Sequence, residues 1–292
     1  MWKSTPSAIR RDFAFDVIDA SFFFPDGPAA VALGRRFGVP VSIKARGADV
    51  HFWGRQPATA AQVLAAGRAA DGLLAVSAAM RDDMIALGMP GERIAVHHTG
   101  IDHSRFAPAP RAPAKAALGV TGPLVVSVGA LIPRKGHDRV IGAVAALPGV
   151  SLIVAGEGPE RSNLEAMIAA EGLGDRVRLT GAVAHDAMPG LMAAADVMAL
   201  ASASEGLANV WVEALACGTP IVVPDVGGAR EVVTDPAHGR LVAPDPAAIA
   251  AGIADLLAAP PDPAAVATGA ARFSWEANAA GLYDHLRSLG GR

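Results

Sequence analysis

The sequence predicts an α/β protein built from two doubly wound domains, each with a parallel sheet. Three observations lead to this fold. The chain has 292 residues, which is more than one ordinary hydrophobic core needs. Short apolar runs alternate with stretches of helical periodicity, as in consecutive βαβ units. A proline-rich segment at 101–113 interrupts this alternation, which then restarts, so we interpret the segment as an interdomain linker.

The first predicted domain, residues 1–105, contains four apolar runs that read as strands. They lie at residues 15–20, 39–45, 72–77 and 93–98, and helices are expected at 27–37, 58–70 and 78–87. A domain of this type usually opens with a strand and a glycine-rich turn. The run at 15–20 is not followed by such a turn, and no other strand with one precedes it, so we expect this domain to be incomplete.

The second predicted domain, residues 106–272, has a cleaner alternation and is expected to be complete. Strands are expected at 124–129, 151–155, 177–181, 197–201, 221–224 and 240–242, and helices at 136–147, 160–170, 186–195, 208–216, 228–233 and 246–258. The remaining segment, 273–292, predicts one more amphipathic helix. We expect this helix to pack back toward the first domain.

Composition excludes several classes of protein. A net charge of −3 argues against a nucleic-acid-binding surface, which requires a basic balance. Cys217 is the single cysteine, so the chain has no internal disulfide and suits a reducing compartment. No apolar run reaches the ~18 residues that span a bilayer, and residues 1–16 lack the apolar core of a signal peptide. We expect a soluble cytoplasmic protein, with contact at the inner face of the membrane left open.

Residues 201–231 carry the chemistry around which the second domain is organised. Glu205 follows a predicted strand, and Glu213 lies in the next helix, with seven residues between the two. Carboxylates accept hydrogen bonds from neighbouring hydroxyls, so this pair suits a sugar on one side and a ribose on the other. A single glutamate would more often cap a helix or form a salt bridge. Between the two lies a helix start with backbone amides, at Gly206, Leu207, Ala208 and Asn209.

Two other strand ends of this domain carry features that suit a phosphate ligand. Gly129 ends one strand, and Arg134 and Lys135 follow at the start of a helix, where free amides already favour anions. These cations would bind a diphosphate, although a solvated basic turn remains the alternative. Gly156 and Gly158 follow the next strand and would let the backbone approach a ligand, or form an ordinary turn.

Taken in order, these motifs resemble the family 4 retaining glycosyltransferases, which use nucleotide sugars and have the GT-B fold. The resemblance extends from Phe15 to the end of the chain. It rests on the Glu205/Glu213 stretch, Pro133-Arg134-Lys135-Gly136, Gly156-Glu157-Gly158-Pro159, Gly227-Gly228 before Glu231, and the Gly100–Phe106 linker pattern G-x-D-x-x-x-F.

This resemblance implies two Rossmann-like domains facing a cleft. It also implies transfer of a hexose from a UDP- or GDP-linked donor, with retention of configuration at the anomeric carbon. The acceptor would be a glycan or a lipid-linked glycan of cell-envelope or polysaccharide biosynthesis. Neither a tightly bound cofactor nor a metal is implied. Glu205, Lys135 and Arg134 would be the catalytic residues, holding the donor sugar and the diphosphate. Glu213 would bind the ribose hydroxyls of the donor, and the segment from Gly181 to Val183 would lie beside the base.

The chain departs from the family pattern at two positions. Ala130 stands where the family has an arginine after the strand glycine, and Arg46 stands where it has the histidine of His-Gly-x-Asp. Arginine binds phosphate or an anionic sugar but cannot act as a base. We therefore take Arg46, Asp49 and His51 as acceptor-side candidates, although a lone histidine is more often structural.

The sequence argues against some other functions and leaves others open. His97 and His98 are neighbours that point to opposite faces of a strand, so we reject a zinc site there. A dinucleotide oxidoreductase lacks its Gly-x-Gly-x-x-Gly turn. A nucleotide-sugar-binding module without transfer activity remains open, because the first domain is short. So does an epimerase or phosphorylase on the same fold.

Overall fold

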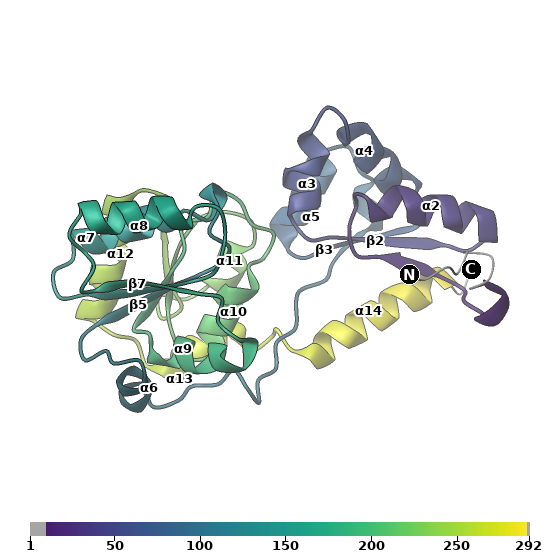
Figure 1. Ribbon diagram of the computed structural model, residues 1–292. Coiled ribbons are helices and arrows are strands. Elements are labelled where there is room, and N and C mark those ends of the chain that lie inside the picture. The colour runs from purple at the N-terminus through teal and green to yellow at the C-terminus, as the bar shows by residue number, and fades with distance from the viewer. Residues whose placement is uncertain (1–9, 291–292) are drawn as a thin grey trace. The chain divides into compact units, whose positions relative to one another are not determined.

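The computed structural model describes residues 10–290 and shows an α/β chain that divides into two compact units (Figure 1). Unit 1 contains the described residues up to Thr99 and those from Glu276 onward, whereas unit 2 is Gly100–Trp275. Residues 1–9 and 291–292 lie outside the described residues. The prediction that residues 1–16 contain no signal peptide therefore falls largely outside the described residues. So do the first residues of the predicted domain 1–105 and the last residues of the predicted helix 273–292.

Unit 1 is built on a parallel sheet with four strands among the described residues. Its order is β1-β2-β3-β4, the order of the chain itself. The strands are β1 (Ile18–Ala20), β2 (Val41–Ala45), β3 (Gly72–Ala75) and β4 (Ile94–Val96). Because every pair is parallel, the loops that follow β1 and β2 leave the sheet at the same edge.

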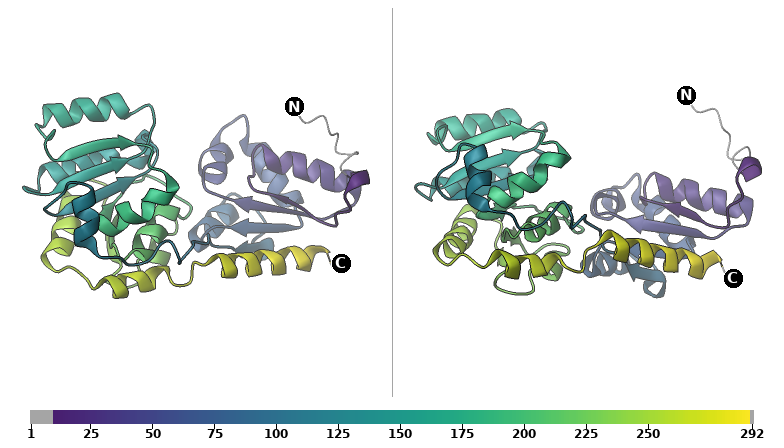
Figure 2. Two further views of the ribbon diagram at one scale, coloured as in Figure 1. Left: turned by 60° about the horizontal axis from the view of Figure 1, so that its bottom comes forward. Right: turned by 90° about the horizontal axis from the view of Figure 1, so that it is seen from below.

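Helices cover both faces of the unit 1 sheet (Figure 2). They are α2 (Asp26–Phe37), α4 (Ala60–Ala69), α5 (Ala78–Ala86) and α14 (Trp275–Gly290), with the short α3 (Ala48–His51), η1 (Trp53–Arg55) and η2 (Gly91–Arg93). Side chains of β2 alternate between the faces. Ile43 packs toward α2, whereas Ser42 hydrogen bonds to His285 of α14 at 3.1 Å. The helix from the far end of the sequence thus completes this unit.

Unit 2 contains a parallel sheet of six described strands in the order β10-β9-β8-β5-β6-β7. They are β5 (Leu124–Val128), β6 (Ser151–Ala155), β7 (Val177–Gly181), β8 (Val197–Ala199), β9 (Ile221–Pro224) and β10 (Gly239–Val242). The chain moves outward from β5 to β7 and then returns to place β8 on the other side of β5. Such a reversal of strand order opens a crevice at the carboxyl ends of the two central strands.

Two hydrophobic cores flank the unit 2 sheet. Val125 of β5 belongs to the core shared with α7 and α12, whereas Leu124 and Val126 belong to the core on the side of α9. The helices are α6 (Arg111–Ala117), α7 (His137–Ala145), α8 (Arg161–Ala170), α9 (Met188–Ala194), α10 (Asn209–Ala216), α11 (Ala229–Val232), α12 (Pro246–Ala258) and α13 (Pro263–Ala267). Short 3-10 helices occur at η3 (Pro133–Lys135), η4 (His185–Ala187) and η5 (Thr268–Ala270).

The predicted fold class is confirmed, with differences in detail. The segment 101–113 was expected to be linker throughout, but α6 begins within it at Arg111. Pro113 lies in the first turn of this helix, where a missing backbone N–H costs no hydrogen bond. Within residues 10–290, no helix is both long and apolar enough to cross a membrane.

Candidate functional site

Two loops meet at the carboxyl ends of β5 and β8, the point where strand order reverses. The β5 loop contains η3 and ends at Gly136, and the amide of Ala203 in the β8 loop donates to the carbonyl of Arg134 at 2.8 Å. Gly136 has a φ of 66°, and a Cβ there would lie 2.3 Å from the carbonyl oxygen of Ala201. Only glycine therefore permits this approach of the loops.

Three of the predicted site residues come together across these loops. The Nζ atom of Lys135 lies 2.5 Å from Oε1 of Glu205, and Nη1 of Arg134 lies 3.6 Å from the same oxygen. Glu205 is buried, and the side chain of Lys135 is only 14% exposed. Arg134 also donates to the carbonyl of Ser204 at 2.5 Å. The result is two cations and one carboxylate concentrated at the edge of the sheet.

The loop after β9 fixes the backbone on which Glu205 stands. Gly227 has a φ of 51°, and a Cβ on it would lie 2.2 Å from the carbonyl oxygen of Glu205. The amide of Gly228 donates to the carbonyl of Gly206 at 2.8 Å. The Gly227-Gly228 pair thus holds the Glu205 loop by direct backbone contact.

Gly156 and Gly158 let the β6 loop lie directly against the β5 loop. A Cβ on Gly156 would lie 1.8 Å from the carbonyl oxygen of Gly129, and one on Gly158 would lie 2.3 Å from that of Leu131. The amide of Leu131 completes the contact by donating to the carbonyl of Glu157 at 2.8 Å. These glycines shape the loop that carries the two cations.

Glu213 lies in α10, one turn beyond the helix start. Burial raises the pKa of its carboxyl group, and the nearby charge of His185 opposes that shift. Among residues 10–290, no hydrogen bond or ion pair occupies this half-buried carboxylate. Leu207 and Ala208 are buried before the helix, and no side chain caps its first amides. A ligand at this helix start would find both free amides and an unpaired carboxylate.

His137, which the sequence analysis did not select, lies under the same loop. It is 2% exposed, and its Nδ1 atom is 2.9 Å from Oγ of Ser127 on β5. Burial lowers the pKa of the imidazole to about 4, so the ring is neutral at pH 7. It therefore supports the loop without adding charge next to Lys135. In the sequence, the only indication that His137 belongs to the site is its position directly after Lys135-Gly136.

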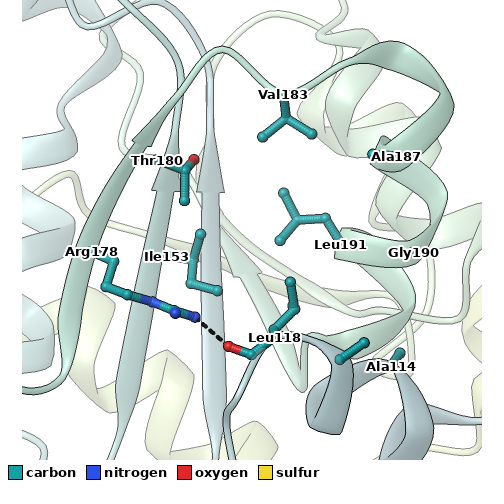
Figure 3. Close-up of a pocket in the computed structure, with 10 residues that line it drawn as sticks. Ala114, Leu118, Ile153, Arg178, Thr180, Val183, Ala187, Gly190 and Leu191 are labelled. Atoms are coloured by element: carbon teal, nitrogen blue, oxygen red, sulfur yellow. Dashed lines mark hydrogen bonds between the residues drawn. The ribbon is translucent and has the colours of Figure 1, made fainter.

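Val183 lies in the loop after β7, at one end of a cavity of about 540 Å³ (Figure 3). This cavity lies between the β6–β7 face of the sheet and helices α6 and α9, and it is mostly apolar. Arg178 is its one ionisable lining residue, and its Nη2 atom donates to the carbonyl of Leu118 at 2.8 Å.

The three acceptor-side candidates lie in unit 1, just after β2, and have different environments. Asp49 is fully buried and accepts hydrogen bonds from the amides of Phe23, Arg46 and Gly47 at 3.2, 3.0 and 2.8 Å. His51 contacts Asp83 of α5, with Nε2 and Oδ2 2.8 Å apart. Arg46 is exposed. Asp49 thus holds the loop, and Arg46 is the candidate that faces water.

Metal binding has no visible basis in the described part of the chain, where no three His, Cys, Asp or Glu residues form a group that could hold an ion.

Comparison with known proteins identifies the family. Residues 109–273 match the family model of glycosyl transferases group 1, and residues 3–105 match that of glycosyltransferase family 4. The chain belongs to the group 1 glycosyl transferases. It is 31% identical over 272 residues to the GDP-mannose-dependent alpha-(1-6)-phosphatidylinositol monomannoside mannosyltransferase of Mycolicibacterium smegmatis, covering 87% of this chain and 71% of that protein.

Other relatives of this glycosyl transferase chain are considerably longer. It is 38% identical over 203 residues to the D-inositol 3-phosphate glycosyltransferase of Mycolicibacterium vanbaalenii, a match that covers 63% of the chain but 45% of the relative. A second such enzyme, from Segniliparus rotundus, is 39% identical over 212 residues, with 68% and 47% covered. The chain thus spans about half the length of these relatives.

Solved structures confirm the two-domain GT-B fold class. Anabaena Alr3699/HepE in complex with UDP and glucose superposes with a TM-score of 0.86 at 25% identity, covering 97% of this chain and 81% of that one. Sucrose-phosphate synthase from Thermosynechococcus elongatus gives a TM-score of 0.83 at 25% identity, covering 98% and 76%.

Proposed function

We propose that the chain transfers a hexosyl group from a nucleoside-diphosphate sugar to a glycan or lipid-linked acceptor, with retention at the anomeric carbon. The observation that carries this proposal is the meeting of Lys135, Arg134 and Glu205 where strand order reverses in unit 2. Family membership supports it, as do relatives whose names specify glycosyl transfer.

The two cations stabilise the leaving group. When the bond between the anomeric carbon and the diphosphate breaks, negative charge accumulates on the phosphate oxygens. Cations fixed in place beforehand stabilise that charge without further reorganisation. The Lys135 ammonium has three N–H donors and directs one toward Glu205, so two remain for phosphate. The uncapped amides at the start of α10 and the guanidinium of Arg134 add to the same site.

The two carboxylates hold the sugar and the ribose. Glu205 accepts hydrogen bonds from donor-sugar hydroxyls, and its charge stabilises the positive character that develops on the sugar ring. Glu213, whose carboxylate makes no hydrogen bond or ion pair among the described residues, binds the ribose hydroxyls. The base lies beside Val183, and Gly129, Gly156 and Gly158 give the phosphate-binding loop its shape.

The donor is linked to UDP or GDP. UDP is named in the HepE complexes, and GDP-mannose in the mycobacterial relative. The acceptor is bound by unit 1, with Arg46 as the residue that contacts it and Asp49 and His51 as residues that support the loop. We place the reaction in cell-envelope or polysaccharide synthesis, in the cytoplasm and at the inner membrane face. Flotation with anionic lipid vesicles tests the membrane contact. If the chain stays in the fraction of unbound protein and does not float with the vesicles, the membrane contact is contradicted.

The test uses the purified chain with a panel of UDP-, GDP- and ADP-sugars. Nucleotide binding is measured by calorimetry, and turnover by nucleotide release in the presence of candidate acceptors. Glu213→Gln should weaken nucleotide binding at least tenfold, because an amide replaces the ribose-binding carboxylate. Glu165→Gln, at an exposed site on α8, is the matched control and should bind as the unaltered chain does.

The outcomes separate the candidate functions. Failure to bind any donor contradicts the proposal as a whole. Donor binding that persists without turnover on any acceptor favours a binding module. Where turnover occurs, proton NMR of the first product reports the anomeric configuration, and an inverted product contradicts retention.

A further inference from the structure

Four aromatic side chains and one arginine gather at the carboxyl edge of the unit 1 sheet, outside the donor-binding residues of unit 2. Phe22 and Phe24 lie in the loop after β1, and Phe52 and Trp53 follow α3 in the connection after β2. Arg46 is the first residue after β2. We call these five residues the aromatic–arginine cluster. Ligands of open parallel sheets bind at this edge.

Three of the rings, those of Phe24, Phe52 and Trp53, contact one another across the two loops. The centroids of Phe24 and Trp53 are 5.4 Å apart, and those of Phe52 and Trp53 are 4.9 Å apart with nearly perpendicular planes. The loops are also joined below the rings, where the amide of Phe23 donates to the buried carboxylate of Asp49 at 3.2 Å. Phe23 itself is fully buried. The rings are therefore held on a fixed base and not on a freely moving loop.

The cluster nevertheless remains in contact with water. Phe52 is 52% exposed and Trp53 is 37% exposed, although both are large apolar side chains. The guanidinium of Arg46 lies 6.0 Å from the centroid of the Phe22 ring, and among residues 10–290 it makes no ion pair. Preorganised exposed rings next to an unpaired cation are typical of a binding surface.

We propose that the aromatic–arginine cluster is the acceptor subsite, where a pyranose ring stacks on Trp53 and Phe52 and an anionic substituent binds Arg46. This inference rests on the proposed function and specifies its acceptor as a sugar that carries a phosphate or carboxylate. The C–H groups on one face of a pyranose carry partial positive charge and match the negative face of an aromatic ring. The planar guanidinium matches the oxygens of a phosphate or carboxylate.

A membrane surface fits this cluster less well. Peripheral binding to anionic lipid depends on about four to eight clustered cations. Arg46 and Arg55 are the exposed cations nearest in sequence to the two rings, and Arg81 is exposed near the start of α5, which begins at the same edge of the sheet. The adjacent pair Arg35 and Arg36 lies in the last turn of α2, which returns the chain to the opposite edge of the sheet before β2 begins. Two or three cations are too few for that mode of binding, and beside rigid rings they favour a small anionic sugar.

The experiment measures glycoside binding to the full chain by saturation-transfer NMR. The probes are methyl glycosides of glucose, mannose, galactose and N-acetylglucosamine, each with and without a 6-phosphate. Trp53→Leu should weaken binding of the preferred glycoside about three- to tenfold, and Trp53→Phe should restore most of it. Arg46→Gln should remove the preference for the phosphorylated form. The control is Tyr283→Leu, another exposed aromatic of unit 1 that lies on α14, outside the cluster.

Binding of UDP and GDP is measured in the same samples, so that the two proposals can fail separately. A chain that binds nucleotide but no glycoside overturns the subsite and leaves the proposed function standing. Equal weakening by Trp53→Leu and Tyr283→Leu overturns it as well. So does Trp53-dependent flotation with anionic vesicles when no glycoside binds. Loss of nucleotide binding with intact glycoside binding contradicts the proposed function alone.

Discussion

Replacing Lys135 by alanine should destabilise unit 2 even in the absence of substrate, because it removes the closest partner of a buried carboxylate. The side chains of Lys135 and Glu205 are only 14% and 9% exposed. Removing one partner of a buried ion pair typically costs about 3–5 kcal/mol, since the other charge stays buried without compensation. Arg134, at 3.6 Å, replaces part of the lost interaction. We therefore expect a loss of about 2–3 kcal/mol.

Urea unfolding followed by tryptophan fluorescence measures this loss, because Trp211 is fully buried in unit 2. Arg161→Ala is the matched control. It breaks an ion pair with Glu165 at 2.9 Å whose side chains are 43% and 52% exposed, and such pairs contribute about 0.3–0.5 kcal/mol. The double variant with Glu205→Gln should recover part of the loss, because it removes the charge that Lys135→Ala leaves unpaired.

An equal effect of Lys135→Ala and Arg161→Ala would refute this reasoning, since the burial of the first pair would then contribute nothing. A double variant less stable than Lys135→Ala would refute it too, because the stranded charge would not be the source of the loss.

Three further predictions concern backbone strain, pH and thiol reactivity. Gly227→Ala should lower stability by more than about 2 kcal/mol, because its φ of 51° is combined with a Cβ position 2.2 Å from a carbonyl oxygen. Gly172→Ala, with a φ of 64° and open space around it, should cost only about 1–2 kcal/mol in urea unfolding. Burial lowers the pKa values of His97 and His285, so the unfolded chain binds protons first and unit 1 should lose stability as the pH falls below about 6.5. Unfolding at pH 7.5 and 5.5 checks this, and a pH effect unchanged in His285→Gln contradicts a role for that ring. Burial raises the pKa of Cys217 to about 12, so a disulfide reagent at pH 8 should label it only after unfolding, and rapid labelling of the native chain would contradict its burial.

Much of unit 2 could be predicted from the sequence because its central strands are buried on both faces. Such strands are continuous apolar runs. The predicted strands at 151–155 and 221–224 accordingly coincide with β6 and β9, which are almost entirely buried. Short elements were not predictable in this way. α3 and η1 span four and three residues, too few for any periodicity to develop.

The candidate site was predicted in part, as a set of residues but not as a set of contacts. The motifs placed Lys135 and Glu205 in one site, yet their direct pairing joins positions 70 residues apart, and no local pattern encodes it. Asp49 was selected for the acceptor side, and the structure shows it holding three backbone amides. His137 was missed because its partner, Ser127, lies on a buried strand and looks like any core residue.

The place of α14 in the chain has a consequence for how the protein is made. Unit 2 is synthesised in full before the helix that completes unit 1. Until then, the sheet face that α14 will cover carries Ser42, Lys44 and His97, and Nε2 of His97 later donates to the backbone carbonyl of Asn278 at 2.8 Å. Because these three side chains are polar, their part of the face exposes little apolar surface to other chains before α14 is in place.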